Sequence, residues 1–89
     1  MIAFMLEGDR EPRNGVAERV DWADGGTFTI RELPSGRLLD NGTEVRVLAV
    51  DPLNYSRIQE SALSFVGGLP TPRASDGSRW LREQLSRER

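Results

Sequence analysis

The stretch that decides the fold of this 89-residue chain spans residues 42–68 and reads G-T-E-V-R-V-L-A-V-D-P-L-N-Y-S-R-I-Q-E-S-A-L-S-F-V-G-G. Its first half alternates in character. The apolar side chains on one face are Val45, Val47 and Ala49. The charged side chains on the other face are Glu44 and Arg46. Alternation with a period of two, rich in valine, predicts a half-buried β-strand over residues 44–50.

The second half of this stretch favours a helix over residues 52–66. Asp51 can cap the first turn with its carboxylate, and Pro52 suits the first helical position, where no N–H is needed. Apolar side chains then recur at steps of three and four residues, at Tyr55, Ile58, Ala62, Phe65 and Val66. Gly67 and Gly68 provide a stop. The alternative is a turn at residues 51–54 followed by another strand.

The rest of the chain reads as short strands separated by turns. Strands are expected at residues 2–7, 16–22, 27–33 and, as a short edge strand, 37–39. A polar loop is expected at residues 8–15, with tight turns at Asn14-Gly15, 23–26, 34–36 and Asn41-Gly42. The first strand is almost wholly apolar, which is typical of a central position in a sheet.

These elements predict an α+β fold. We expect a small antiparallel sheet or open barrel of four to five strands, followed by one packing helix and a C-terminal helical tail. The expected core residues are Leu6, Val20, Trp22, Phe28, Ile30, Val45, Val47, Ile58, Ala62 and Phe65.

The chain divides into a β-sheet plus helix domain, residues 1–68, and a C-terminal part, residues 69–89. That part starts with a proline-containing linker over residues 69–74 and continues as a helix near residues 76–87. An aromatic anchor flanked by arginines is common at interface hot spots. The predicted partner-binding residues are therefore Arg79, Trp80, Leu81, Arg82 and Leu85. The alternative is that the tail folds back and Trp80 docks on its own sheet.

The composition disfavours enzymes. The chain contains neither His nor Cys, and all twelve basic residues are Arg, so no His or Lys can activate a nucleophile. We expect no catalytic residue, no cofactor and no metal site. Asp21 and Asp24 flank a turn where two carboxylates could hold a divalent ion, but ordinary turn chemistry accounts for both. The glycine pairs lack the strand and helix context of a phosphate-binding loop.

The charge distribution bears on the partner. Residues 1–66 carry eleven acids against seven arginines, whereas residues 67–89 carry three acids against five arginines. An acidic body makes nucleic acid an unlikely partner, because phosphate binding depends on basic charge. No segment has the roughly 20 apolar residues needed to span a bilayer, and residues 1–6 lack a basic signal-peptide start. A cytoplasmic, membrane-free location is expected.

One segment resembles a known family. V-L-A-V-D-P-L-N-Y-S-R-I-Q, residues 47–59, is similar to the stretch of prevent-host-death type antitoxins in which a strand gives way to a helix around a tyrosine and an aliphatic residue. Tyr55 and Ile58 hold the matching places. The later L-P-T-P and W-L-R-E-Q-L resemble antitoxin tails in style. The resemblance implies a non-enzymatic protein whose C-terminal segment wraps another protein, with a toxin as the candidate.

The resemblance covers about a third of the chain. That family begins with a helix that builds its DNA-binding dimer, whereas residues 1–33 read here as strands and turns, so operator binding is not carried over. The main hypothesis is an antitoxin-like protein-binding module. The alternative is a self-associating structural or accessory subunit of a phage or multi-protein assembly, in which the first strand and the tail pair between copies. A small-ligand or enzymatic β-barrel is disfavoured because His, Lys and Cys are all missing.

Overall fold

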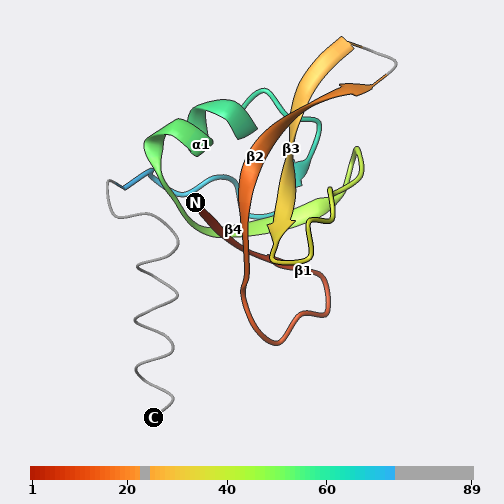
Figure 1. Ribbon diagram of the computed structural model, residues 1–89. Coiled ribbons are helices and arrows are strands. Elements are labelled where there is room, and N and C mark those ends of the chain that lie inside the picture. Colours follow the sequence, from red (N-terminus) through yellow and green to blue (C-terminus); the bar gives the residue numbers. More distant parts are fainter. Residues whose placement is uncertain (23–24, 74–89) are drawn as a thin grey trace.

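The computed structural model describes residues 1–22 and 25–73, the side chains of residues 22, 25 and 26 excepted (Figure 1). The elements in chain order are β1 (Ile2–Leu6), β2 (Arg13–Trp22), β3 (Gly25–Leu33), β4 (Glu44–Val50), α1 (Pro52–Ile58) and β5 (Ser64–Phe65). A five-stranded mixed sheet with one short helix confirms the predicted α+β class. The predicted C-terminal helix at residues 76–87 lies outside the described residues.

The strands follow the order β3-β2-β1-β4-β5, which places the first strand in the middle of the sheet. All neighbouring pairs are antiparallel except β4 and β5, which run parallel. Ile2, Ala3 and Phe4 are fully buried. A strand with neighbours on both edges and protein on both faces needs apolar side chains throughout, so the central position predicted from composition is confirmed.

A β-bulge in the pairing of β1 with β4 changes which side chains of β4 face the core. Ala3 pairs with Ala49 but Phe4 pairs with Val47, so Leu48 is the extra residue. An extra residue reverses which side chains face the core beyond it. Val50 is therefore fully buried in the core with Val45 and Val47, while Ala49 lies on the opposite face. The prediction that residue 49 shares the face of residues 45 and 47 was wrong.

The predicted helix over residues 52–66 is only half present. It ends at Ile58, and the chain then returns as extended structure whose β5 pairs with β4. Three backbone hydrogen bonds hold the returning segment, from Gly42 to Ala62 at 2.9 Å, from Ser64 to Thr43 at 2.9 Å and from Val66 to Val45 at 2.8 Å. The helix prediction is therefore correct for residues 52–58 and wrong for residues 59–66, and the alternative of a turn at residues 51–54 leading into a strand is wrong. The free edge of β4 satisfies backbone groups that a longer helix would have paired internally.

The expected Asp51 cap was also wrong. Its side chain makes no hydrogen bond that caps α1. Instead, Asp51 Oδ1 accepts hydrogen bonds from the Met1 ammonium at 2.8 Å and from Asn54 Nδ2 at 2.5 Å. Burial works against ionisation of this carboxyl, but these donors outweigh it and lower the pKa of Asp51. The residue joins the start of β1 to the start of α1.

The core fills the space between the sheet and α1. Its buried apolar members are Ile2, Phe4, Ala17, Phe28, Ile30, Leu39, Val45, Val47, Val50, Ile58 and Leu63. Five expected core residues are among them, Phe28, Ile30, Val45, Val47 and Ile58. Four other expected core residues are less buried than predicted. Leu6 and Phe65 are partly buried beside the core, and Val20 and Ala62 are half-buried. The Trp22 side chain lies outside the described part.

Two predicted local structures differ. Asn14-Gly15 is not a turn but part of β2, where Gly15 is buried opposite Ile2. Residues 37–39 do not form an edge strand; they make a single bridge, between Leu38 and Arg31, and a 3.0 Å hydrogen bond from Leu39 N–H to the Ile30 carbonyl. The turn at residues 34–36, closed by a 2.7 Å hydrogen bond from Gly36 N–H to the Glu32 carbonyl, brings this short segment back along the outer edge of β3.

Candidate functional site

The five predicted partner-binding residues, Arg79, Trp80, Leu81, Arg82 and Leu85, lie outside the described residues. The described chain ends with the linker, where Leu69 packs against the core. Arg73 N–H then donates a 3.0 Å hydrogen bond to the carbonyl of Val50, the last residue of β4. Since Val50 pairs with Ile2, the C-terminal part starts beside the beginning of the central strand.

The edge of β2 that faces away from β3 pairs with another strand along only part of its length. From Arg13 to Gly15 it pairs with β1, but β1 begins at Ile2, opposite Gly15. Just beyond, the Ala17 N–H donates a 2.9 Å hydrogen bond to Asn54 Oδ1 of α1. A helix side chain thus replaces the missing strand at one position. Among the described elements, no strand pairs with β2 on this side beyond Gly15.

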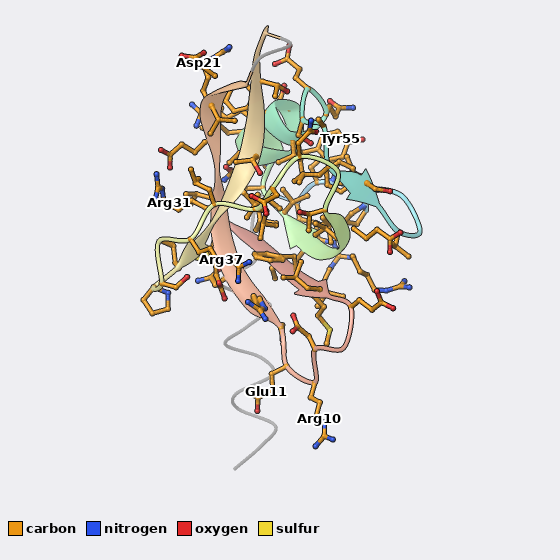
Figure 2. All side chains as sticks on the ribbon, turned by 90° about the vertical axis from the view of Figure 1, so that its right-hand side faces the viewer. Arg10, Glu11, Asp21, Arg31, Arg37 and Tyr55 are labelled. Atoms are coloured by element: carbon orange, nitrogen blue, oxygen red, sulfur yellow. The ribbon has the colours of Figure 1, made fainter. Side chains whose placement is uncertain are left out.

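The outer part of the β2–β3 hairpin, residues 18–22 of β2 with residues 25–28 of β3, is called the hairpin arm here. In Figure 1 it rises past α1 and away from β1 and β4. Figure 2 shows Asp21 at this end of the molecule, while Arg10 and Glu11 of the β1–β2 loop lie at the opposite end. The arm is therefore the most prominent projection of the described fold.

Charged side chains mark the inner face of the arm. The Arg19 guanidinium lies 4.7 Å from the centre of the Phe28 ring, and that of Arg57 lies 5.9 Å from it. Arg19 and Phe28 are direct cross-strand neighbours. Arg19 and Asp21 are exposed, and within the described ranges neither forms an ion pair. Their charges remain available to a partner.

The other long edge of the hairpin is covered. Leu39 N–H donates to the Ile30 carbonyl, and Glu32 N–H donates 2.8 Å to the Arg37 carbonyl, both on the outer edge of β3. Further along the same edge, Phe28 forms a parallel bridge with Ser61, and the Thr27 hydroxyl donates to the Glu60 carbonyl. The chain protects β3 against further strand pairing but leaves the adjoining edge of β2 open.

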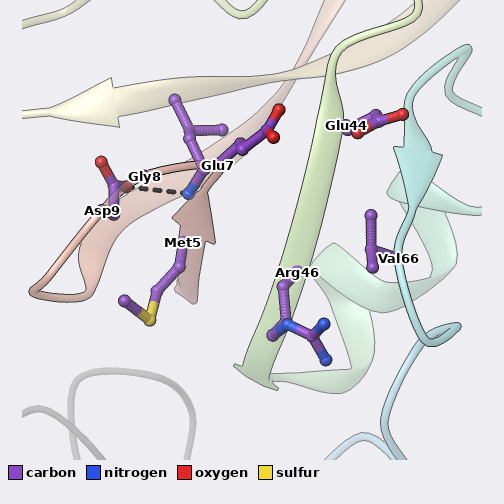
Figure 3. A pocket seen from close by; sticks show the side chains of 8 residues that line it. Met5, Glu7, Gly8, Asp9, Glu44, Arg46 and Val66 are labelled. Atoms are coloured by element: carbon purple, nitrogen blue, oxygen red, sulfur yellow. Dashed lines mark hydrogen bonds between the residues drawn. The ribbon is translucent and has the colours of Figure 1, made fainter.

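A pocket of about 350 Å³ lies on the outer face of β1 and β4 (Figure 3). Its walls are formed by Met5, Leu6, Glu7, Gly8, Asp9, Glu44, Arg46 and Val66. Val66 is 40% exposed, and Glu7, Glu44 and Arg46 are also exposed. The pocket could accept an apolar side chain next to a charged group. It holds no His, Cys or Lys, so it contains no general base or nucleophile of those types.

The carboxylate of Asp9, at the rim of this pocket, already has partners. It accepts 2.8 Å and 3.0 Å hydrogen bonds from Arg13 Nε and Nη2, and another of 2.8 Å from the Leu6 N–H. Arg13 also donates 3.0 Å to Glu32 Oε2. Hydrogen bonding to Arg13 lowers the pKa of Asp9, and the pairing with Asp9 raises the pKa of Arg13. The network fastens the β1–β2 loop to the start of β2 and to Glu32 of β3.

Neither a metal-binding cluster nor a membrane-spanning helix occurs among the described residues. Within residues 1–22 and 25–73, no group of three or more His, Cys, Asp or Glu side chains could hold a metal ion. Asp24 lies outside these residues, so the possible Asp21–Asp24 pair has no described geometry. No described helix is long and apolar enough to cross a membrane.

Comparisons with protein-family models, with curated proteins and with solved structures gave no match to this chain. The sequence pattern predicted partner-binding residues in the tail and did not single out the exposed charges of the hairpin arm. The available signal was a strand reading E-R-V-D-W, with opposite charges two residues apart. It also missed Asn54, an amide buried in the first turn of a helix.

Proposed function

We propose that this chain is a non-enzymatic protein-binding module of the cytoplasm, in which residues 1–68 act as scaffold and the C-terminal segment binds another protein. The binding residues in this proposal are Arg79, Trp80, Leu81, Arg82 and Leu85. The resemblance of residues 47–59 to prevent-host-death type antitoxins makes a toxin the first candidate partner.

One observation supports the proposal: within the described part of the chain, side chains from Ile2 to Leu63 form a hydrophobic core, and Leu69 packs against it. Arg73, anchored to the end of β4, fixes the point from which the tail departs. The tail adds only three large apolar side chains, Trp80, Leu81 and Leu85. Burying each gives about 1.5–3 kcal/mol, whereas ordering a dozen residues costs about 1–2 kcal/mol each, so a partner surface supplies the missing contacts.

The non-enzymatic part of the proposal rests on the side chains. His, Lys and Cys are absent from the sequence. Asp9 and Asp51, the two described carboxylates with a lowered pKa that lie next to the central strand, are both held by cations in structural pairs. A carboxylate held ionised by a fixed partner is a poor general base.

The test compares three full-length proteins as bait in pull-downs from native cells, with captured proteins identified by mass spectrometry. These are the unchanged chain, Trp80→Ala, and Leu53→Ala as matched control. Leu53 is 58% exposed on α1, so its loss removes an exposed apolar side chain from the body. We expect Trp80→Ala to lose the captured protein and Leu53→Ala to keep it, with both melting temperatures unchanged. Equal capture by all three, or a large drop in melting temperature for Trp80→Ala, would refute the tail as binding segment.

A second candidate, a self-associating structural or accessory subunit, is favoured by one observation, the open outer edge of β2. An unpaired strand edge is a template for pairing with another strand. Capture of a foreign protein separates the two candidates, because a subunit that only self-associates would capture its own chain alone.

A further inference from the structure

The direction of the backbone groups in β2 follows from three hydrogen bonds. Ala17 N–H points away from β3, because it donates to Asn54. Opposite Ala17 and Gly15, the backbone groups of Ile30 and Glu32 point away from β2, toward residues 39 and 37. Backbone groups alternate in direction along an antiparallel ladder. The N–H and C=O groups of Arg19 and Asp21 therefore point outward, like those of Ala17.

Within residues 1–22 and 25–73, no strand pairs with these outward groups, so this edge is open to pairing. Asn54 occupies the position next to Ala17, and α1 then crosses the inner face toward β3, where Ser61 bridges Phe28. Beyond Ala17 the arm leads away from β1 and β4 (Figure 1), and its contacts with Arg57, Glu60 and Ser61 are made by β3. A strand added here must therefore pair with residues 18–22.

The charges of Arg19 and Asp21 favour a second copy of β2 as the added strand, and they favour one alignment of the two strands. Two copies of this edge can pair antiparallel in a two-fold arrangement only where outward groups oppose outward groups. Centring on Arg19 or on Asp21 would place like charges directly opposite each other, which destabilises a sheet. Centring on Val20 places Arg19 of each copy opposite Asp21 of the other.

We propose that two copies of this chain associate through antiparallel pairing of their β2 edges, centred on Val20, with Arg19 of each copy opposite Asp21 of the second. Each Arg19–Asp21 pair exchanges both backbone hydrogen bonds, because their groups point toward the partner strand. The ion pairs lie on the inner face of the arm, where Arg19 already rests on Phe28. Val20, half-buried in the single chain, meets its counterpart on the other face.

The interface is short, so the dimer is weak and reversible. It involves one strand end, far below the area of a stable protein interface. Exposed ion pairs contribute little each and are screened by salt. We therefore expect association from micromolar to millimolar protein, weaker at high salt. The inference is independent of the proposed tail function, since no residue beyond Trp22 of β2 takes part in the pairing.

The test is a charge exchange in the full-length chain, read out by sedimentation velocity across a concentration series. Arg19→Asp and Asp21→Arg each place like charges opposite each other twice in the dimer. Each should weaken the dimerisation constant by about tenfold or more. The double variant, Arg19→Asp with Asp21→Arg, restores complementary pairs and should restore the dimer. An equimolar mixture of the two single variants should form a heterodimer, for the same reason.

A matched control and a residue-specific readout complete the design. Glu7→Arg and Arg46→Glu reverse exposed charges on the outer face of β1 and β4, and should leave the dimer unchanged.

Amide hydrogen exchange at Arg19 and Asp21 should slow as protein concentration rises, because these N–H groups become paired. A chain that stays monomeric up to millimolar concentration, or a dimer insensitive to both single reversals, would overturn the pairing. Loss of partner capture by Trp80→Ala would leave it untouched.

Discussion

Strand β2 passes through two environments within ten residues. From Arg13 to Gly15 it lies between β1 and β3, and at Ala17 its N–H donates to Asn54. From residue 18 outward it pairs only with β3, and its free edge carries Arg19 and Asp21. In the inner part, nearby backbone and core atoms limit the size of the side chain that fits. In the outer part, side chains face solvent and carry charge. We therefore expect substitutions in the outer part to change the proposed dimerisation more than the stability of the fold.

The largest effect should come from the side chain on which the inner part rests. Phe4 is fully buried in β1 and pairs with Arg13 at the start of β2. Phe4→Ala should cost about 3–5 kcal/mol, because it removes buried surface and leaves a cavity. Urea denaturation measures the loss, with Val20→Ala as a smaller truncation in the hairpin arm. A loss for Phe4→Ala no larger than that for Val20→Ala would contradict the role of Phe4 in the core.

The second prediction concerns the closest approach in the structure. A Cβ added to Gly15 would lie 2.7 Å from the Arg31 carbonyl oxygen, 2.7 Å from Ile30 Cγ2 and 3.0 Å from Phe4 Cε1. Gly15→Ala should therefore cost about 1–3 kcal/mol through overpacking. Because one of these atoms belongs to the backbone of β3, trimming side chains cannot relieve the clash fully.

Gly8→Ala is the control for this clash. Gly8 has a φ of 86° but no atom within 4 Å of the added Cβ, so it tests backbone strain without contact. Amide chemical shifts of Ile30 and Arg31 should move in Gly15→Ala and stay in place in Gly8→Ala. Unchanged stability for Gly15→Ala would mean that β2 and β3 can separate at this point without cost.

Sequence patterns predicted the fold class and the central strand because these depend on composition over several residues. An apolar run such as residues 2–6 indicates burial wherever its neighbours come from. The end of α1 was not predictable in this way. Ile58 and Phe65 fit one helical stripe, but the edge of β4 competes for the backbone of residues 62–66. Nor did Asn14-Gly15 reveal a strand, since the need for glycine arises from β3 and Phe4.

The binding surfaces were less accessible to sequence reasoning than the fold. Arg19 and Asp21 form a charge pattern that many exposed strands share. Its meaning depends on β1 starting at Ile2, opposite Gly15, which leaves the outer part of β2 without a neighbour. The predicted tail residues rest on composition and resemblance alone. Register is set by distant pairing, so an open edge can be recognised only once the sheet is known.

The third prediction tests whether the Asn54 side chain takes the place of a neighbouring strand beside Ala17. Asn54 is 7% exposed, and its Oδ1 is the acceptor for the Ala17 N–H. Asn54→Ala leaves this buried donor unpaired and should cost about 1–3 kcal/mol. Amide exchange at Ala17 should accelerate, whereas exchange at Arg19 in the monomer should not change. Ser56→Ala, an exposed change on the same helix, is the control, and slow exchange at Ala17 in both variants would contradict the assignment.

The smallest effect concerns the ion pair that closes the inner end of β2, and it depends on pH. The Asp9 side chain is 13% exposed and accepts two hydrogen bonds from Arg13, which lower its pKa in the folded state. A group with a lowered folded pKa stabilises the fold above its unfolded pKa of about 4, and that contribution is lost as the pH falls through the folded pKa.

At neutral pH, Asp9→Asn should cost up to about 1 kcal/mol, as for other pairs near the surface, because Arg13 keeps its ion pair with Glu32. The difference in unfolding free energy between the two proteins should stay constant from pH 7 to about pH 5 and shrink below about pH 4. Glu7→Gln, an exposed change two residues away, controls for lost charge alone. If the Asp9→Asn difference persisted undiminished at low pH, the stabilisation would not come from the charge of Asp9, and the contribution assigned to its ion pair with Arg13 would be wrong.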